Sequence, residues 1–177
     1  MATAVTPVIL GFLSLGPRSG YEIKAAVDRS TRFFWAASYG QIYPELRRLE
    51  DDGLVEGEDA PNGRRARRIY RLTSAGREAL KAWLNGPMEG VEVRDENLLR
   101  LFFADVLPRE QALLLLEGRR RFHEELLAAL RVIDARPGVD PPFVDLVLRW
   151  GLDFNAWGAE WCKAELQRLS PEPATTV

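Results

Sequence analysis

The sequence contains few of the residues on which catalysis and metal binding usually depend. A single cysteine, Cys162, excludes an internal disulfide and leaves too few thiols for a zinc site. It lies beside Trp161 and is expected to be a small packed residue, with a redox-sensing thiol as the alternative. The only histidine, His123, lies among arginines and glutamates, so we expect it to be solvated at the surface. Neither a glycine-rich phosphate loop nor a nucleophile–base pair is visible in the sequence. The sequence therefore argues against an enzyme, a metal site or a cofactor.

Long apolar runs are missing as well. None approaches the roughly 20 residues that a membrane-spanning helix needs. The short apolar segment near the N-terminus has no basic residues before it, which argues against a signal peptide. We therefore expect a cytoplasmic protein without a membrane partner. Its 177 residues, 46% hydrophobic and 28% charged, suit one medium globular domain or two small ones.

Charge is divided unevenly along the chain. The net charge is −2, but residues 1–85 hold 13 basic and 10 acidic residues, which gives +3. Residues 86–177 hold 11 basic and 16 acidic residues, which gives −5. Local fields rather than net charge draw a polyanion to one face of a protein. The first half is therefore the candidate for binding nucleic acid.

Two helices are expected in the first 30 residues. The first should span Thr3 to Leu15 and end at Gly16-Pro17. Ser19 and Glu22 have the spacing of a capping box, so a second helix should begin at Ser19 and run to about Asp28. Its inward face should carry four residues: Tyr21, Ile23, Ala26 and Val27.

A third helix should follow, with Ser38 as its N-cap. Ile42, Leu46 and Leu49 have the i, i+4, i+7 spacing of one buried stripe, and Gly53 follows as a C-terminal breaker. Pro44 removes a backbone hydrogen bond beyond the first turn, so we expect the helix either to start later or to bend. The opposite face carries a different set: Gly40, Gln41, Tyr43, Pro44, Arg47 and Arg48.

A basic hairpin is predicted next. Two strands, Leu54 to Glu58 and Arg67 to Leu72, are joined across a turn that contains Asn62-Gly63. On the second strand Tyr70 and Leu72 should face inward and Arg67 and Arg71 outward. Four arginines lie within five residues after the turn: Arg64, Arg65, Arg67 and Arg68. A fourth helix, capped by Thr73 or Ser74, should then bury Leu80, Trp83 and Leu84.

This order of elements predicts a winged helix-turn-helix that binds duplex DNA. The major groove admits one helix and exposes sequence information there. Ser38, Gly40 and Gln41 allow close approach to base edges, and Gln41 can pair with adenine. Tyr43 is placed for a phosphate oxygen, and Arg47 or Arg48 can reach guanine or phosphate. The wing arginines, Arg64, Arg65, Arg67 and Arg68, have donor geometry for phosphates or the minor groove.

Two other interpretations compete with DNA binding. The arginines can simply solvate the hairpin, as most runs of charge do. A winged helix can also serve as a protein-interaction module without DNA binding. The arginine-laden wing distinguishes the DNA binder, because an interaction module has no need of it.

The second half should be helical, so we expect a DNA-binding domain at 1–86 and a dimerisation or effector domain at 87–177. Helices are predicted at 96–106, from Pro108 to about Ala135, and from about Pro142 to Leu169. The last helix carries aromatic and apolar residues on one face: Phe143, Val147, Trp150, Phe154, Trp157 and Trp161. Three roles remain open for this stripe. It can pack against the preceding helix through Leu113, Leu116, Phe122, Leu126 and Leu130, form a dimer interface, or line a pocket for a flat aromatic effector.

Three segments closely resemble the PadR family of bacterial transcriptional regulators. They are SGYEI, SYGQIYPELRRLEDDGLV and RRIYRLTSAGREAL, within residues 7–84. The long helical second half is similar in layout to the subgroup of the phenolic-acid repressor. The resemblance implies a homodimeric winged-helix repressor that a small molecule releases from its operator. It supports Ser38, Gly40, Gln41, Tyr43 and the wing as the DNA surface. It also implies that six residues are structural: Tyr21, Leu46, Leu49, Gly53, Tyr70 and Leu72.

Overall fold

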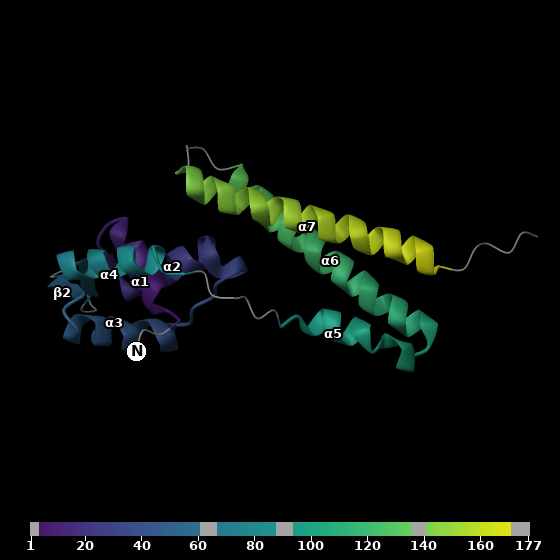
Figure 1. Cartoon of the computed structure of the whole chain (residues 1–177), viewed down its shortest axis with the longest axis horizontal. Coiled ribbons are helices and arrows are strands. Elements are labelled where there is room, and N and C mark those ends of the chain that lie inside the picture. The colour runs from purple at the N-terminus through teal and green to yellow at the C-terminus, as the bar shows by residue number, and fades with distance from the viewer. Residues whose placement is uncertain (1–3, 61–66, 88–93, 136–140, 171–177) are drawn as a thin grey trace, which may run out of the picture. The chain divides into compact units, whose positions relative to one another are not determined.

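A computed structural model describes residues 4–60, 67–87, 94–135 and 141–170 of the chain. The chain divides into two compact units, Met1–Gly90 and Val91–Val177 (Figure 1). Both are mainly helical, as predicted, and the first also contains a small antiparallel sheet. Within the described residues, no helix is both long enough and apolar enough to cross a membrane.

The first unit has the element order predicted for a winged helix-turn-helix. Its elements are α1 (Thr6–Ser14), β1 (Arg18–Ser19), α2 (Gly20–Arg29), the 3-10 turn η1 (Thr31–Phe33), α3 (Tyr39–Asp51), β2 (Val55–Ala60), β3 (Arg67–Leu72) and α4 (Ser74–Leu84). The core lies where α1, α2 and α3 meet the strands. Its fully buried members include Ile9, Leu13, Ile23, Val27, Ile42, Leu46, Leu49 and Val55.

Polar side chains fix where these helices start. The Ser19 hydroxyl accepts a hydrogen bond from the Glu22 nitrogen, and the Glu22 carboxylate accepts one from the Ser19 nitrogen, which completes the predicted capping box of α2. Thr73 caps α4 by accepting from the Gly76 nitrogen at 3.0 Å. Ser38 caps α3, as predicted. Because each cap supplies a partner to a backbone group without one, the starts of the helices were predictable from sequence.

The sheet has one strand more than the hairpin predicted from sequence. Its order is β1-β3-β2, with both pairs antiparallel. The two residues of β1 pair with the inner strand, Arg18 opposite Tyr70 and Ser19 opposite Ile69. A two-residue strand has no period from which to predict it. The inward positions of Tyr70 and Leu72 are confirmed, whereas the predicted Asn62-Gly63 turn lies outside the described residues.

Three predictions about the first unit are wrong. Tyr21 is 65% exposed rather than inward, and Trp83 and Leu84 on α4 are also exposed. The periodic pattern predicted each helix correctly. It did not show how much of the apolar face of that helix the neighbouring elements bury. Of the two effects expected of Pro44, a later start is excluded, because α3 begins at Tyr39 and continues through Pro44. The hydrogen bond that Pro44 cannot make would end on Gly40, which lies at the surface and is open to water.

The second unit is built from helices alone in its described part. Its elements are α5 (Glu96–Phe102), the 3-10 turn η2 (Ala104–Val106), α6 (Arg109–Asp134) and α7 (Pro142–Leu169). The long helices α6 and α7 pack along each other, and α5 packs on α6 (Figure 1). The bounds of α6 and α7 agree with those expected from the sequence.

His123 is buried between α6 and α7, so its predicted place at the surface is wrong. Only 3% of the residue is exposed, and its Nδ1 lies 2.9 Å from Asn155 Oδ1. Because the Asn155 amide nitrogen donates to the Gly151 carbonyl at 2.8 Å, Oδ1 is the acceptor and the histidine Nδ1 carries the proton. The charged neighbours of His123 in sequence point to other faces of α6, which a one-dimensional reading missed.

Cys162 lies one turn along α7 from Gly158 and is fully buried, which confirms the packed residue expected from sequence. Burial raises the pKa of its thiol above the ordinary value. The reactive thiolate is therefore disfavoured, which argues against the redox alternative.

We predict that Gly158→Ala destabilises the second unit. A Cβ at this position would lie 2.8 Å from three atoms of the His123 ring, which is itself enclosed. Overpacking of this kind costs about 1–3 kcal/mol. The matched control is Gly118→Ala on α6, where a Cβ meets nothing within 4 Å. That substitution should raise stability by up to about 1 kcal/mol, because alanine is the better helix former. Thermal and urea unfolding measure both, and equal effects would contradict the packing described for His123.

Candidate nucleic-acid interface

The outer face of α3 is an open surface of polar and aromatic residues. Its inner stripe, Ile42, Leu46 and Leu49, has no exposed area and holds the helix on the core. The residues between face solvent: Ser38, Tyr39, Gly40, Gln41, Tyr43, Pro44 and Arg47. The structure therefore brings most of the predicted residues of this helix together on one face, which is open to solvent.

Gln41 has a structural role at the start of α3. Its Oε1 accepts hydrogen bonds from the Ser38 backbone nitrogen at 2.9 Å and from the Ser38 hydroxyl at 3.1 Å. Pairing with adenine uses both the oxygen and the amide nitrogen of a glutamine. In this conformation the oxygen is engaged with Ser38, so Gln41 must share it or leave the cap to read a base in that way.

Three exposed tyrosines form a row across α2 and α3. The ring centroids of Tyr21 and Tyr39 are 6.4 Å apart, and those of Tyr39 and Tyr43 are 6.1 Å apart, with both pairs stacked. Gly20 makes this approach possible, because a Cβ there would lie 2.8 Å from the Tyr43 ring. Tyr39 was missed by the sequence analysis, although its i, i+4 spacing with Tyr43 on the outer face was a usable signal.

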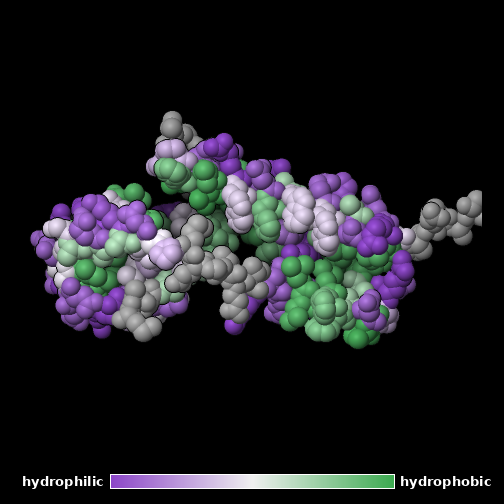
Figure 2. Space-filling view, in the orientation of Figure 1, coloured by the Kyte–Doolittle hydropathy of each residue, from purple (hydrophilic) through white to green (hydrophobic). Residues whose placement is uncertain are grey.

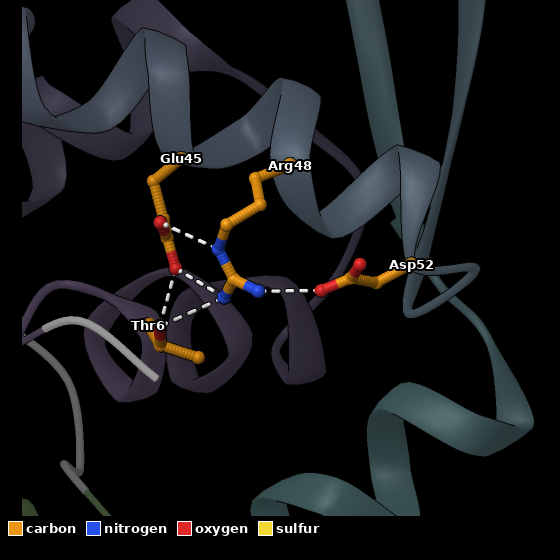
Figure 3. A network of polar contacts seen from close by, with 4 residues as sticks. All are labelled: Thr6, Glu45, Arg48 and Asp52. Carbon is orange, nitrogen blue, oxygen red and sulfur yellow. Dashed lines mark hydrogen bonds and ion pairs between the residues drawn. The ribbon is translucent and has the colours of Figure 1, made fainter. Parts of the chain in front are cut away.

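Arg47 and Arg48 differ sharply in their surroundings. The Arg48 guanidinium contacts the Glu45 carboxylate, with an Nη2–Oε1 distance of 2.7 Å and an Nε–Oε2 distance of 3.1 Å (Figure 3), and Glu45 is only 5% exposed. It also donates to Asp52 at 2.5 Å and to Thr6 of α1 at 3.3 Å, and the Thr6 hydroxyl donates to Glu45. Arg47 is exposed and has no hydrogen bond or ion pair with any residue that the structure describes. The structure therefore places Arg48 in the domain's framework and leaves Arg47 available.

The two described wing arginines are paired with carboxylates of the same unit. Arg67 forms an ion pair with Glu22 of α2. Arg68 pairs with Glu50 of α3 at 2.5 Å and with Asp59 of β2 at 2.9 Å. Gly57 of β2 makes room for the pair between Arg68 and Glu50, since a Cβ there would lie 2.5 Å from Arg68. The other two predicted wing residues, Arg64 and Arg65, lie outside the described residues.

These pairs shift the pKa values of the carboxylates. The hydrogen bond from Arg67, followed by that from the Ser19 backbone, lowers the pKa of Glu22 to about 2. The hydrogen bond from Arg68 lowers the pKa of Glu50, and the hydrogen bond from the Gly57 backbone nitrogen lowers it further. The wing is therefore tied electrostatically to both α2 and α3 at neutral pH.

The aromatic stripe of α7 lies on the exposed side of that helix. The rings of Trp150, Phe154, Trp157 and Trp161 follow one another along it, with neighbouring ring centroids 5.3, 6.3 and 6.4 Å apart. The side that faces α6 instead carries Asn155, Gly158, Ala159 and Cys162. Packing against α6 explains only part of the stripe: the Phe154 ring meets His123 of α6 edge-on at a centroid distance of 5.8 Å, but the tryptophans are 39–62% exposed. The dimer interface and the ligand wall remain.

A second apolar surface covers α5 and η2 (Figure 2). Its exposed members are Leu98, Leu99, Phe102, Phe103, Val106 and Leu107. Contiguous apolar patches of this kind mark contact surfaces in most proteins.

The first unit has the fold and open helix of the winged-helix class of DNA-binding proteins. The transcriptional regulator PadR-like family model matches residues 9–82, and a model for the C-terminal region of virulence activators matches residues 93–170. The chain belongs to the PadR-like family of transcriptional regulators.

Among characterised proteins, the chain is similar to the negative transcriptional regulator PadR of Bacillus subtilis. The two are 36% identical over 107 residues, which cover 59% of this chain and 58% of the Bacillus protein. The chain's match therefore spans less than two thirds of that relative's length.

Solved structures extend the similarity over nearly the whole chain. Bacillus subtilis PadR in complex with operator DNA has a TM-score of 0.85 at 28% identity, covering 95% of this chain and 100% of that one. The same protein in complex with p-coumaric acid has a TM-score of 0.78 at 27% identity, covering 96% and 97%. The virulence activator AphA of Vibrio cholerae has a TM-score of 0.70 at 30% identity, covering 93% and 97%.

We predict that Glu22→Gln weakens the fold at neutral pH but not at strongly acidic pH. The folded pKa of Glu22 is depressed from 4.5 to about 2, so its pair with Arg67 stabilises the fold above pH 4.5. That contribution is lost as the pH falls from 4.5 towards 2. Because the side chain is 39% exposed, solvent screening limits the contribution to at most about 1 kcal/mol.

Urea unfolding followed by circular dichroism, for wild type and variant across this pH range, measures the effect. Gln still allows the capping hydrogen bond, so the variant isolates the charge. The difference should also shrink at about 1 M salt. A difference between the two proteins that stayed constant from neutral to acidic pH would contradict the assignment.

Proposed function

We propose that the protein is a homodimeric repressor that binds an inverted-repeat operator and is released from it by a small molecule. The observation that carries the proposal is the open outer face of α3 beside a basic wing, in a chain that belongs to a family of transcriptional regulators. The similarity to a regulator solved with operator DNA supports it. A cytoplasmic location follows from this role.

In the proposed complex α3 enters the major groove from its N-terminal end. Gly40 leaves room for the backbone to approach base edges, and Ser38 and Gln41 supply polar groups there. Tyr43 and Arg47 contact phosphate, and Arg47 has no ion pair with any residue in the described part of the chain. The wing arginines, Arg64, Arg65, Arg67 and Arg68, contact phosphates or the minor groove. For Arg67 and Arg68 this requires the DNA to share or replace their carboxylate partners.

The dimer is proposed to form through the exposed apolar faces of the second unit. One recognition helix reads few base pairs, and two related by a two-fold axis read an inverted repeat with half-sites about 34 Å apart. The stripe of Phe143, Val147, Trp150, Phe154, Trp157 and Trp161 and the patch on α5 and η2 supply the apolar area that a permanent interface needs.

Release by an effector is proposed from the relative that is solved with p-coumaric acid. A ligand can shift DNA binding only by its differential affinity for two dimer geometries, one of which has the wrong spacing of the recognition helices. A flat aromatic effector against the α7 stripe fits this scheme.

The alternative, a winged-helix interaction module without DNA binding, predicts a stable complex with another protein and no retardation of DNA. Gel retardation of a labelled duplex that carries the chain's own promoter separates the two. Footprinting on that duplex then locates the half-sites.

We predict that Arg47→Ala and Arg48→Ala fail in different ways. Arg47→Ala should weaken operator binding by about tenfold and lower the slope of log K against log salt by about 1, because one phosphate contact is lost. Its unfolding free energy should stay within about 0.5 kcal/mol of wild type. Arg48→Ala leaves the buried Glu45 without its guanidinium, which should cost about 1–3 kcal/mol of stability.

Retardation over a salt series and urea unfolding measure both properties for both variants. An Arg47→Ala protein that binds like wild type removes Arg47 from the interface. Wild-type binding that is specific but insensitive to salt would refute phosphate contact by this whole surface.

We predict that Trp157→Ser shifts the protein from dimer to monomer. Trp157 is 62% exposed in the single chain, and burying such a ring at an interface centre typically contributes about 2 kcal/mol or more. Lys163→Ala, an exposed change on the same helix, is the control and should leave the dimer intact. Sedimentation velocity at micromolar concentration gives the answer. A wild-type monomer at that concentration would end the role proposed for α7.

A further inference from the structure

Three tyrosines form a continuous row on the surface of the first unit. Tyr39 and Tyr43 lie one turn apart on α3, and Tyr21 of α2 continues the row beyond Tyr39. The three residues are 42–65% exposed, and none of their hydroxyls has a hydrogen bond with any residue that the structure describes. Single exposed aromatic residues are common, whereas a group of them marks a contact surface. The row is therefore a candidate for binding a partner.

The spacing of the row fits the backbone of one DNA strand. Neighbouring ring centroids lie 6.4 and 6.1 Å apart, and interplanar angles of 15° and 23° keep the rings nearly parallel. Successive phosphates of one strand lie about 6–7 Å apart in space, given a rise of about 3.4 Å per nucleotide and the turn of the double helix. Tyrosine is among the side chains that bind phosphate oxygens. Three tyrosines at this spacing therefore correspond to three successive phosphates.

Basic side chains lie beside the row. Arg47 follows Tyr43 after one turn on the same face of α3, is exposed, and has no ion pair with any described residue. The Nζ atom of Lys24 on α2 lies 5.5 Å from the centroid of the Tyr39 ring. A cation in these positions attracts an anionic partner to the hydroxyls between them.

The carboxylates near the row do not oppose such a partner. Those of α2, Glu22 and Asp28, are each paired with a basic side chain, Arg67 and Lys24 respectively. On the row's face of α3, Asp51 lies one turn beyond Arg47 and is thus separated from the tyrosines by that arginine. The charge pattern therefore favours a polyanion over an acidic protein surface held by apolar contacts alone.

We propose that Tyr21, Tyr39 and Tyr43 bind three successive phosphates of one DNA strand through their hydroxyls. The interface then extends from α3 onto α2, and Tyr21 and Tyr39 become DNA contacts beside Tyr43. This role of the row rests on the proposed function, in which α3 lies in the major groove and the strand that borders the groove passes over α2. Because a phenol is an uncharged donor, the row adds affinity without releasing counterions from the DNA.

Phenylalanine substitutions in the full-length protein test the hydroxyls alone. Tyr21→Phe and Tyr39→Phe should each weaken binding to a labelled duplex that carries the chain's own promoter by about three- to tenfold, because a hydrogen bond to a charged acceptor is lost. An unrelated duplex of equal length should lose affinity by the same factor, since phosphates carry no sequence information. The slope of log K against log salt should stay that of wild type, whereas Arg47→Ala lowers it by about 1. Fluorescence anisotropy over a salt series measures all of these.

Trp83→Phe on α4 is the matched control. Trp83 is also an exposed aromatic residue of the first unit but is not part of the row, so this variant should bind both duplexes as wild type does. Tyr21→Ala and Tyr39→Ala remove the ring together with the hydroxyl and should weaken binding at least as much as the phenylalanine variants. Urea unfolding and sedimentation of the phenylalanine variants should match wild type, which separates a lost contact from a lost fold or dimer.

Several outcomes would overturn the role of the row. If Arg47→Ala weakens binding but both phenylalanine variants bind as wild type does, the proposed function stands and the hydroxyls are not contacts. If in addition the alanine variants bind weakly, the rings pack on sugars or bases instead. A loss confined to the promoter duplex assigns the hydroxyls to base edges, and a monomeric phenylalanine variant places the row between two copies of the chain. If folded wild type binds neither duplex, the proposed function fails and the role of the row fails with it.

Discussion

Three buried side chains of α3 determine which face of this helix lies on the core and which face is open to solvent. Ile42, Leu46 and Leu49 have no exposed surface, so the rotation of the helix about its axis is fixed. Once that rotation is fixed, the residues on the opposite side of the helix must face water, whatever their chemistry. Glu45, next to the stripe, is drawn inward and is held by Arg48 and Thr6, which ties α3 to α1 (Figure 3). The open face is thus a consequence of packing on the closed one.

Charge within this unit is largely compensated in place. Arg67 and Arg68 contribute to the basic character of the wing, yet each pairs with a carboxylate of a helix beside it. The same pairs hold β3 against α2 and α3, so they orient the wing before any partner arrives. A polyanion that replaced those carboxylates would gain contacts while loosening the wing from the helices. Net charge alone, at −2, describes none of this balance.

Local signals in the sequence predicted most of the fold, and interactions between distant segments explain where prediction failed. Caps at Ser19, Ser38 and Thr73 act within four residues, so they could be read directly. The strand β1 has two residues and exists only because β3 lies beside it. His123 was misplaced because the group that satisfies it, Asn155, is 32 residues away. On the candidate DNA surface, sequence gave the helix face correctly. The sequence could not show that Arg47 and Arg48 differ in their contacts, since that difference depends on the contacts of Arg48 with Thr6 and Glu45.

The burial of Cys162 gives the second unit an internal reporter. The thiol has no exposed surface and lies on the side of α7 that faces α6, and burial raises its pKa. A thiol reagent can therefore react only when the two helices separate, at a rate set by the population of that open form. Because the chain has one cysteine, the labelling rate follows this single event with no background from other thiols. The labelling rate of Cys162 in the unmodified protein therefore measures how often α6 and α7 separate, and how a bound partner changes that frequency.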